Sequence, residues 1–329
     1  MKRISSDPRE AFIQGSKLSA TQASQLEKRL RLHPDDLSIR SALLSFYWPN
    51  SEKYRHERRS HILWVIRSAP LSFTARSMAL EVDPRRDRAL FKEVSEAWVQ
   101  AIRSHPDITT VLSNAARFFS RNRWFKAKSL ILRARALDPK NPRWNSELGK
   151  LYGSKAKESN GFQRSRLQTL SLRAYEAAFG LSDSLHRFYL LDDLAKAAFK
   201  TGNLTKAARY AKRLLNQANI YRKDWNYGNA VHHGHTILGQ ISLRKGRRPS
   251  AIQHLLASSQ VPSNSPQMST FGPRMDLAQE LLVLDERQAI LDFFKRCAAF
   301  WRLGYERLHK WRDLVQKNKM PDFTSSISY

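Results

Sequence analysis

The sequence predicts an all-α protein, and three observations support this fold class. Glycine and proline are scarce, at 12 and 13 of 329 residues, while residues that favour helices are plentiful. No segment alternates apolar and polar residues for long enough to predict a sheet. Four prolines that end predicted helices are 36, 36 and 33 residues apart, namely Pro34, Pro70, Pro106 and Pro139. An interval of this size predicts a chain built from repeated pairs of helices.

One helix pair is clearest between residues 122 and 151. One helix face is indicated by apolar residues at positions i, i+4 and i+7, namely Ala127, Ile131 and Ala134. That helix ends at Pro139, because proline cannot continue a helix. A second helix is predicted to begin after Pro142 and carries Leu148-Gly149-x-x-Tyr152. Small residues at these positions predict helices that lie close together.

Two later segments place small residues at matching intervals. Seven residues separate Ala195 from Gly202 and also Gly239 from Gly246, and five more lead to Ala207 and Ala251. We expect the glycines to allow tight turns between paired helices. The whole pattern resembles the tetratricopeptide repeat (TPR), a helix–turn–helix unit of about 34 residues. The resemblance covers residues 108–260 well and residues 20–106 weakly.

Two stretches partly outside the repeat pattern, GNAVHHGHTILG and SPQMSTFGPRMDLAQELL, are similar to a group of uncharacterised bacterial TPR proteins. The resemblance implies a TPR-like right-handed superhelix of antiparallel helix pairs, closed by a C-terminal helical cap. We also expect a helix over residues 72–82. The expected segments are a disordered lead-in (1–18), degenerate N-terminal helical repeats (19–106), TPR-like repeats (107–260), the helical cap (261–318) and a flexible tail (319–329).

The chain is strongly basic, with a formal net charge of +28. Such a surplus attracts polyanions, although a basic surface is also simply well solvated. Between Lys196 and Arg274 the only acidic residue is Asp224, against thirteen lysines and arginines. The aromatic residues interleaved there, which suit base stacking beside phosphate contacts, are Tyr210, Tyr221, Trp225 and Tyr227. The alternative is a solvated convex face, because most of these cations lie on the second helix of a pair.

The cellular location is predicted from what the sequence lacks. The single cysteine, Cys297, excludes an intramolecular disulfide and a cysteine-rich zinc site. The start, MKRISSDPREAF, has no apolar core of a signal peptide. Apolar runs are far shorter than the roughly 18 residues that span a membrane. We therefore expect a soluble cytoplasmic protein that does not bind membranes.

Candidate catalytic and metal-binding residues are few. A cluster on one predicted helix pair offers imidazoles to zinc, copper or nickel, or serves packing and hydrogen bonding: His232, His233, His235 and His254. Cys297 lies within the apolar stretch FFKRCAAFW, which favours an inert buried thiol. The adjacent carboxylates Asp192 and Asp193 point apart on a helix, so they do not form an acid–base couple. We expect no enzymatic activity, catalytic residue, cofactor or metal.

The first helix of each pair lines the concave groove of such a repeat protein. By repeat spacing, the expected partner groove comprises Arg143, Glu147, Lys150, Tyr189, Asp192, Asp193, Lys196, Lys200, His233, Thr236, Gln240 and Arg244. We expect a non-catalytic scaffold that binds a peptide or a segment of another protein in this groove. The alternative is a nucleic-acid-associated helical repeat protein that uses its basic face.

Overall fold

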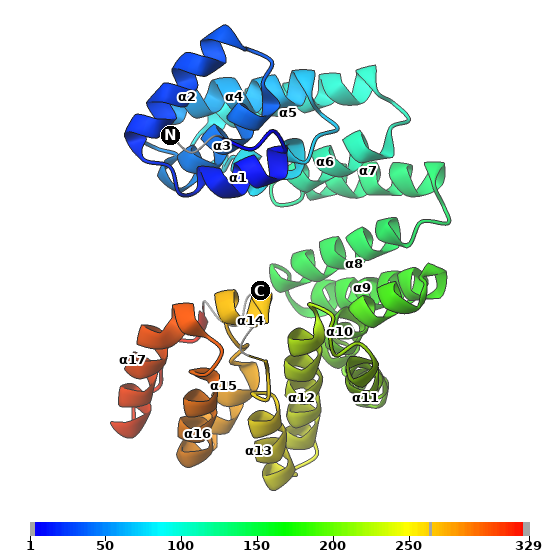
Figure 1. Cartoon of the computed structure of the whole chain (residues 1–329). Coiled ribbons are helices and arrows are strands. Elements are labelled where there is room, and N and C mark those ends of the chain that lie inside the picture. Colours follow the sequence, from blue (N-terminus) through cyan, green and yellow to red (C-terminus); the bar gives the residue numbers. More distant parts are fainter. Residues whose placement is uncertain (1–3, 263–264, 325–329) are drawn as a thin grey trace. The chain divides into compact units, whose positions relative to one another are not determined.

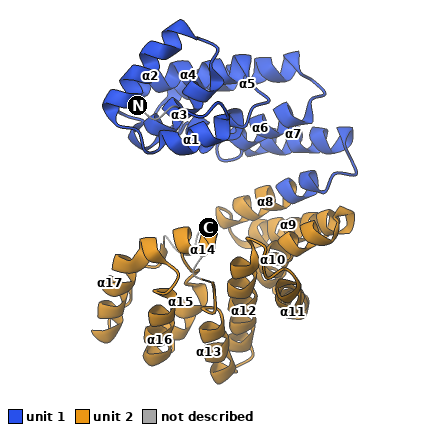
Figure 2. Cartoon of the chain, in the orientation of Figure 1, with its two compact units in different colours: residues 1–147 blue, residues 148–329 orange. Residues whose placement is uncertain are grey.

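The computed structural model describes residues 4–262 and 265–324, and across them the chain is helical, without a β-strand (Figure 1). The predicted all-α class is confirmed. The chain divides into two compact units, residues 1–147 and 148–329 (Figure 2). The division falls inside α8 (Pro142–Lys157), and not at the expected segment boundaries near residues 106 and 260.

Unit 1, residues 1–147, contains seven α-helices ahead of α8 in its described part: α1 (Pro8–Gly15), α2 (Ala20–Leu32), α3 (Leu37–Tyr47), α4 (Arg55–Ser68), α5 (Arg88–Ser104), α6 (Thr109–Phe119) and α7 (Trp124–Leu137). Neighbours in sequence pack together, with α3 on α4, α4 on α5 and α6 on α7. Four of the helices begin where a side chain accepts a hydrogen bond from the exposed backbone N–H groups of the first turn, and α1 is capped in this way by Asp7. The other three capping residues are Ser19, Asp36 and Asp87.

The helix expected over residues 72–82 does not form, and this prediction is wrong. Two short 3-10 turns, Thr74–Arg76 and Met78–Leu80, take its place. Within the segment, the Ser72 hydroxyl accepts a hydrogen bond from the Ala75 backbone N–H. Arg58 of α4 donates to the carbonyls of Ala79 and Glu81. The segment is therefore a connector whose backbone is bonded both within its own turns and by Arg58.

The expected disordered lead-in, residues 1–18, is also wrong for its described part. Residues 8–15 form α1, whose first turn is capped by the Asp7 carboxylate. Gly15 lets α1 approach α3 closely, because a Cβ atom there would lie only 2.1 Å from the Ala42 carbonyl oxygen. Residues 1–3 of the expected lead-in lie outside the described residues.

Unit 2, residues 148–329, continues the series of helix pairs. After α8 come α9 (Gly161–Leu181), α10 (Ser184–Lys200), α11 (Leu204–Ile220), α12 (Tyr227–Arg244), α13 (Arg248–Ala257), α14 (Pro266–Phe271), α15 (Asp276–Val283), α16 (Arg287–Cys297) and α17 (Tyr305–Gln316). First helices stack on first helices, with α10 against α12 and α12 against α15. Second helices do the same, with α13 against α16. The α15–α16 pair, which was expected within a separate cap, therefore extends the stack.

Small residues lie at the helix contacts, as predicted. Ala127, Ala134 and Ala207 are fully buried. Gly239 is buried against α15, where a Cβ atom would lie 2.3 Å from Leu277 Cδ2. The turn glycines Gly202 and Gly246 have φ values of +77° and +68°, a conformation that glycine adopts without steric cost.

Side-chain bonds between neighbouring repeats have the spacing of the prolines. Ser113 bonds Glu147, and Tyr210 bonds Glu176, each across 34 residues. Another such bond, from Arg59 of α4 to Glu93 of α5, also spans 34 residues. Equivalent positions of successive helix pairs thus contact one another, and the repeat of about 34 residues is a property of the packing.

The described end of the chain packs on the last helices. Five aromatic residues of this region are buried and form its core: Phe293, Phe294, Phe300, Trp301 and Trp311. Phe323 is buried too, and its ring lies 4.9 Å from that of Trp311. The expected flexible tail, 319–329, is thus anchored at Phe323, and residues 325–329 lie outside the described part. Across the described chain, every helix is too short or too polar to cross a membrane.

Candidate functional site

One face of α10 carries five residues of the expected groove. Asp183 caps the start of this helix by accepting from the His186 backbone N–H. Side chains three or four residues apart lie along one face of a helix. On α10 the side chains of this face all keep some exposed surface: Tyr189, Asp192, Asp193, Lys196 and Lys200. Leu191, Leu194 and Ala198 point into the core. From Tyr189 to Lys200 the face spans 11 residue steps, or about 16 Å at the rise of an α-helix.

Asp192 is the centre of a polar network on this face. Its Oδ2 atom lies 2.8 Å from Lys196 Nζ and 2.8 Å from His233 Nδ1 of α12. The side chains of Asp192 and Lys196 are 20% and 17% exposed, and that of His233 is 8% exposed. The network therefore links two stacked first helices in a mostly dry environment.

The charge states of this network follow from its surroundings. Burial raises the pKa of Asp192, but His233 and Lys196 outweigh that effect, so the pKa lies below its ordinary value. Burial lowers the pKa of His233 although Asp192 opposes the shift. At pH 7 we therefore assign an ionised Asp192, a charged Lys196 and a neutral His233 that donates its Nδ1–H to Asp192.

Cations gather beyond the end of this network. Partial burial and the positive charges of Lys157, Arg274 and Lys196 together lower the pKa of Lys200 to about 8, although Asp276, which pairs with Arg274, opposes the shift. Lys150 and Lys200 also act on the adjacent Asp193, whose pKa burial raises. Cations that repel one another in this way are stabilised by a bound anion. We name Lys150, Lys157, Lys196, Lys200 and Arg274 the lysine cluster.

An aromatic pair lies at the opposite end of the α10 face. The rings of Tyr189 and Trp225 are 5.5 Å apart and tilted by 42°. The Tyr189 hydroxyl donates to Asp224 Oδ2 at 2.8 Å, which fixes this ring against the loop before α12. Trp225 is 51% exposed. A large exposed ring held by a fixed neighbour is a surface on which a planar group can stack.

The other expected groove residues are divided between the units. In unit 1, Arg143 bonds Glu147 and Ser113. In unit 2, the side chains of His233, Thr236 and Gln240 are buried between helices, so they support the face more than they line it. Arg244 is exposed and pairs with Glu280 of α15. Whether these residues contact a partner stays a prediction.

The sequence reasoning missed residues that come from the segment assigned to the cap. Glu280 holds Arg244 and Gln240, and Arg274 contributes to the lysine cluster. Glu280 follows Arg244 by 36 residues, so extending the repeat interval by one unit would have found it. The loop position of Arg274 has no such signal in the sequence.

The histidine cluster is used in hydrogen bonds. His232 Nδ1–H donates to the Ser258 carbonyl at 2.9 Å, and its Nε2 accepts from the Arg274 backbone N–H at 2.9 Å. His235 and His254 bond each other through their Nδ1 atoms at 3.1 Å. Within residues 4–262 and 265–324 there is no group of three or more metal-ligating side chains in a suitable arrangement. The packing and hydrogen-bonding interpretation accounts for these contacts.

His232 should make stability depend on pH. Burial lowers the pKa of His232 to about 3, whereas an unfolded histidine titrates near 6.5. The unfolded chain therefore takes up a proton first, and stability falls as the pH falls below about 6.5, by ~1.4 kcal/mol per pH unit. Urea unfolding at pH 6.5 and 5 should show about 2 kcal/mol less pH dependence in His232→Gln than in the native chain. Equal pH dependence in both proteins would contradict the assignment.

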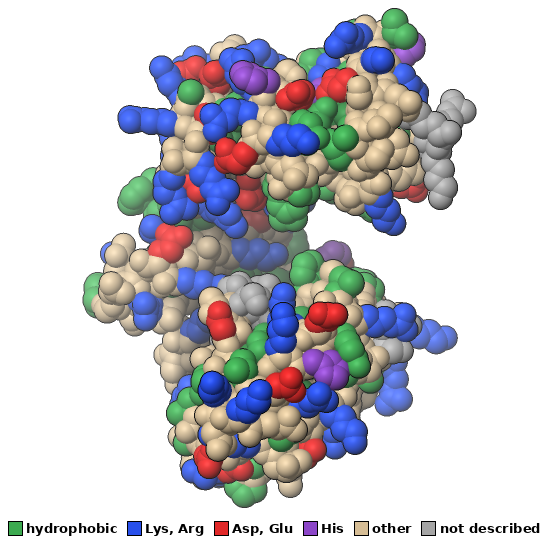
Figure 3. All heavy atoms as spheres, turned by 90° about the vertical axis from the view of Figure 1, so that its left-hand side faces the viewer, with side chains coloured by type: hydrophobic (Ala, Val, Ile, Leu, Met, Phe, Trp, Pro, Cys, Tyr) green, Lys and Arg blue, Asp and Glu red, His purple; other side chains and the backbone are tan. Residues whose placement is uncertain are grey.

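Basic side chains are spread widely over the surface. Figure 3 shows lysines and arginines over much of the visible face of each unit, with acidic residues among them. On α11, Arg209, Lys212 and Arg213 are exposed. The Arg213 guanidinium lies 4.9 Å from the centre of the Phe179 ring, so its stem packs on an aromatic neighbour. The net charge alone does not select one binding face.

Comparisons with known proteins bear on the fold. Human IFIT1, solved as a dimer with m7Gppp-AAAA, aligns with a TM-score of 0.50 at 14% identity, over 94% of this chain and 72% of that chain. The likeness supports a helical-repeat fold. The human IFIT1 dimer with PPP-AAAA aligns with a TM-score of 0.49 at 15% identity, over 92% of this chain and 72% of that chain. No model of a protein family matches the sequence. No curated protein matches it either.

Proposed function

We propose that unit 2 binds single-stranded nucleic acid along the α10 face, without catalysing a reaction. The observation that carries the proposal is the pairing of two features at opposite ends of the α10 face. Tyr189, which packs on the exposed Trp225, and Lys200 of the lysine cluster lie 11 residue steps apart, or about 16 Å along the helix. Aromatic rings stack on bases, and lysines neutralise phosphates. The separation suits a strand a few nucleotides long.

The charge state of Lys200 supports the same proposal. Burial and the repulsion of neighbouring cations lower the pKa of Lys200 to about 8, and a phosphate beside the lysine cluster would offset the repulsion. The carboxylate of Asp192 is already bound to Lys196, and that of Asp224 to Tyr189. Human IFIT1, whose fold is similar, is solved with PPP-AAAA and with m7Gppp-AAAA. An adenylate oligomer is therefore a reasonable probe.

Fluorescence anisotropy with a labelled 15-nucleotide oligo(A) RNA, measured from 50 to 200 mM salt, tests the proposal. Trp225→Ala should weaken binding about tenfold through lost stacking, with an unchanged salt dependence. Lys200→Gln should lower the slope of log affinity against log salt by about 0.7, the value for one phosphate contact on a single strand.

The matched controls lie in unit 1. Trp48→Ala removes another exposed tryptophan, 40% accessible, and Lys28→Gln removes an exposed lysine. Neither should change the affinity by more than about twofold. The proposal fails if the oligomer does not bind at 50 mM salt, or if the control variants weaken it as much as the unit 2 variants.

The carboxylates on the groove helices favour a second candidate function, the peptide-binding scaffold. Asp193 and Glu280 would repel a phosphate but attract the side chains of a basic peptide. In that case a labelled lysine-rich peptide should bind, Glu280→Gln should weaken it, and oligo(A) should not bind. We also propose that the chain belongs to the TPR family and is related to the bacterial group named above.

A further inference from the structure

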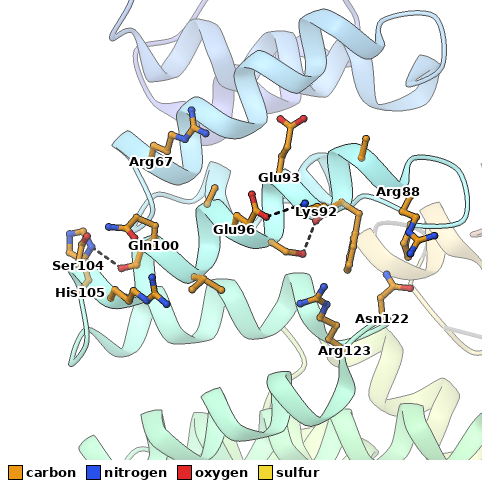
Figure 4. A pocket seen from close by; sticks show the side chains of 18 residues that line it. Arg67, Arg88, Lys92, Glu93, Glu96, Gln100, Ser104, His105, Asn122 and Arg123 are labelled. Carbon is orange, nitrogen blue, oxygen red and sulfur yellow. Dashed lines mark hydrogen bonds and ion pairs between the residues drawn. The ribbon is translucent and has the colours of Figure 1, made fainter.

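Unit 1 has a cleft of about 1460 Å³ along the exposed face of α5. Its walls are the end of α4, the length of α5 and the turn before α7 (Figure 4). Arg123 points from that turn toward α5, and Glu93 points toward α4. The volume is larger than the 300–1,000 Å³ typical of small-molecule pockets. A segment of a macromolecule is therefore a better match for its size.

Arginines dominate the charge of this cleft. Across the described residues, no ion pair within 4.0 Å involves Arg67, Arg88, Arg103 or Arg123. The Arg123 guanidinium lies 5.5 Å from the centre of the Phe91 ring. Burial lowers the pKa of the nearby Lys126, and Arg123 and Arg103 lower it further. Guanidinium groups without acidic partners suit the bidentate recognition of carboxylates or phosphates.

Two glutamates in the middle of the cleft discriminate between these ligands. Glu93 accepts two hydrogen bonds from Arg59, at 2.9 and 2.7 Å, and Glu96 lies 4.0 Å from Lys92. A nucleic acid carries a negative charge at every step and would meet both carboxylates. A polypeptide places acidic residues beside the arginines and neutral or basic residues beside the glutamates.

The aromatic content points the same way. Among the described residues that line the cleft, the only aromatic ring apart from His105 is Phe91, which is 6% exposed. The cleft therefore lacks the open stacking surface that Trp225 provides in unit 2. We propose that the arginine-lined cleft of unit 1 binds an acidic polypeptide segment of a partner protein.

The length of the segment follows from the cleft. Arg88 and Arg103 are 15 residues apart on α5, which is about 22 Å along the helix. Some seven residues of extended chain or four turns of helix cover that distance. A suitable probe is a fluorescent 14-residue peptide of alternating Glu-Glu and Ala-Ala pairs.

Fluorescence anisotropy with the full chain and this peptide at 100 mM salt tests the proposal. Arg88→Glu with Arg103→Glu should weaken binding at least tenfold. The control, Arg29→Glu with Arg31→Glu, makes the same charge change at exposed positions of α2 in the same unit and should weaken it less than threefold. Circular dichroism reports whether each variant is folded. If the double variant is unfolded, Arg103→Gln alone replaces it, with an expected loss of peptide affinity of about threefold.

Oligo(A) RNA separates this proposal from the one for unit 2. Trp225→Ala should weaken binding of the RNA and leave binding of the peptide unchanged. The cleft variant, Arg88→Glu with Arg103→Glu, should weaken binding of the peptide and leave binding of the RNA unchanged. Equal loss of peptide binding in the cleft and α2 variants would overturn the proposal, because only the total charge would then matter. The proposal would also be overturned if the cleft variant weakened binding of the RNA as much as binding of the peptide, since the cleft would then be a nucleic-acid surface.

Discussion

Replacing Asp192 with alanine is expected to lower the free energy of unfolding of unit 2 by about 3 kcal/mol, because it leaves a mostly buried charge without its partner. Asp192 Oδ2 holds both Lys196 and His233 at 2.8 Å. The Lys196 side chain is only 17% exposed, so water replaces the lost carboxylate poorly. Chemical denaturation monitored by circular dichroism measures the change.

A double variant tests whether the unpaired lysine causes this loss. Asp192→Ala with Lys196→Met removes both charges and keeps most of the lysine stem, so it should recover about half of the lost stability. Asp183→Ala removes an exposed capping carboxylate of the same helix and should cost only about 1 kcal/mol. If the double variant is no more stable than Asp192→Ala, the buried ion pair is not the source of the effect.

Replacing Trp301 with alanine should cost about 3–5 kcal/mol, the range for removing a large aromatic side chain from a core. Trp301 is 2% exposed, and its ring lies 5.8 Å from that of Trp311. The backbone at Gly272 and Gly304 lies directly on the indole, since a Cβ atom at either position would be within 2.2 Å of it. The cavity would therefore be enclosed by segments that cannot easily collapse into it.

Leu303 provides the control for Trp301, because it is two residues away and 77% exposed. Leu303→Ala should change stability by less than about 0.5 kcal/mol. Limited proteolysis of both variants adds a local measurement, with faster cleavage expected in residues 272–324 of Trp301→Ala only. Similar losses in the two variants would show that the indole is not a structural centre of this region.

Much of the fold was predictable, because it depends on local signals. The spacing of the prolines, the small residues of Ala127 and Gly239, and the turn glycines Gly202 and Gly246 each act within one or two helices. The segment 72–82 was not predictable in this way. Arg58 of α4 donates to the carbonyls of Ala79 and Glu81, and helix propensity contains no information about such contacts.

The candidate site was predictable only in part. Repeat spacing placed Tyr189, Asp192 and Lys196 on one face, because the period of a helix is fixed. The same spacing assigned Thr236 and Gln240 to the groove, but the close packing of α12 buries them. The cleft along α5 depends on the distances between α4, α5 and the turn before α7, and no sequence pattern defines those distances.

The polar bonds that span 34 residues constrain which insertions and deletions this chain tolerates. Losing one complete helix pair would present each donor with an equivalent helix from the next pair. Losing ten residues would instead rotate one helix and bring its carboxylates opposite apolar positions. Natural variants of this chain should therefore differ in length by multiples of one pair.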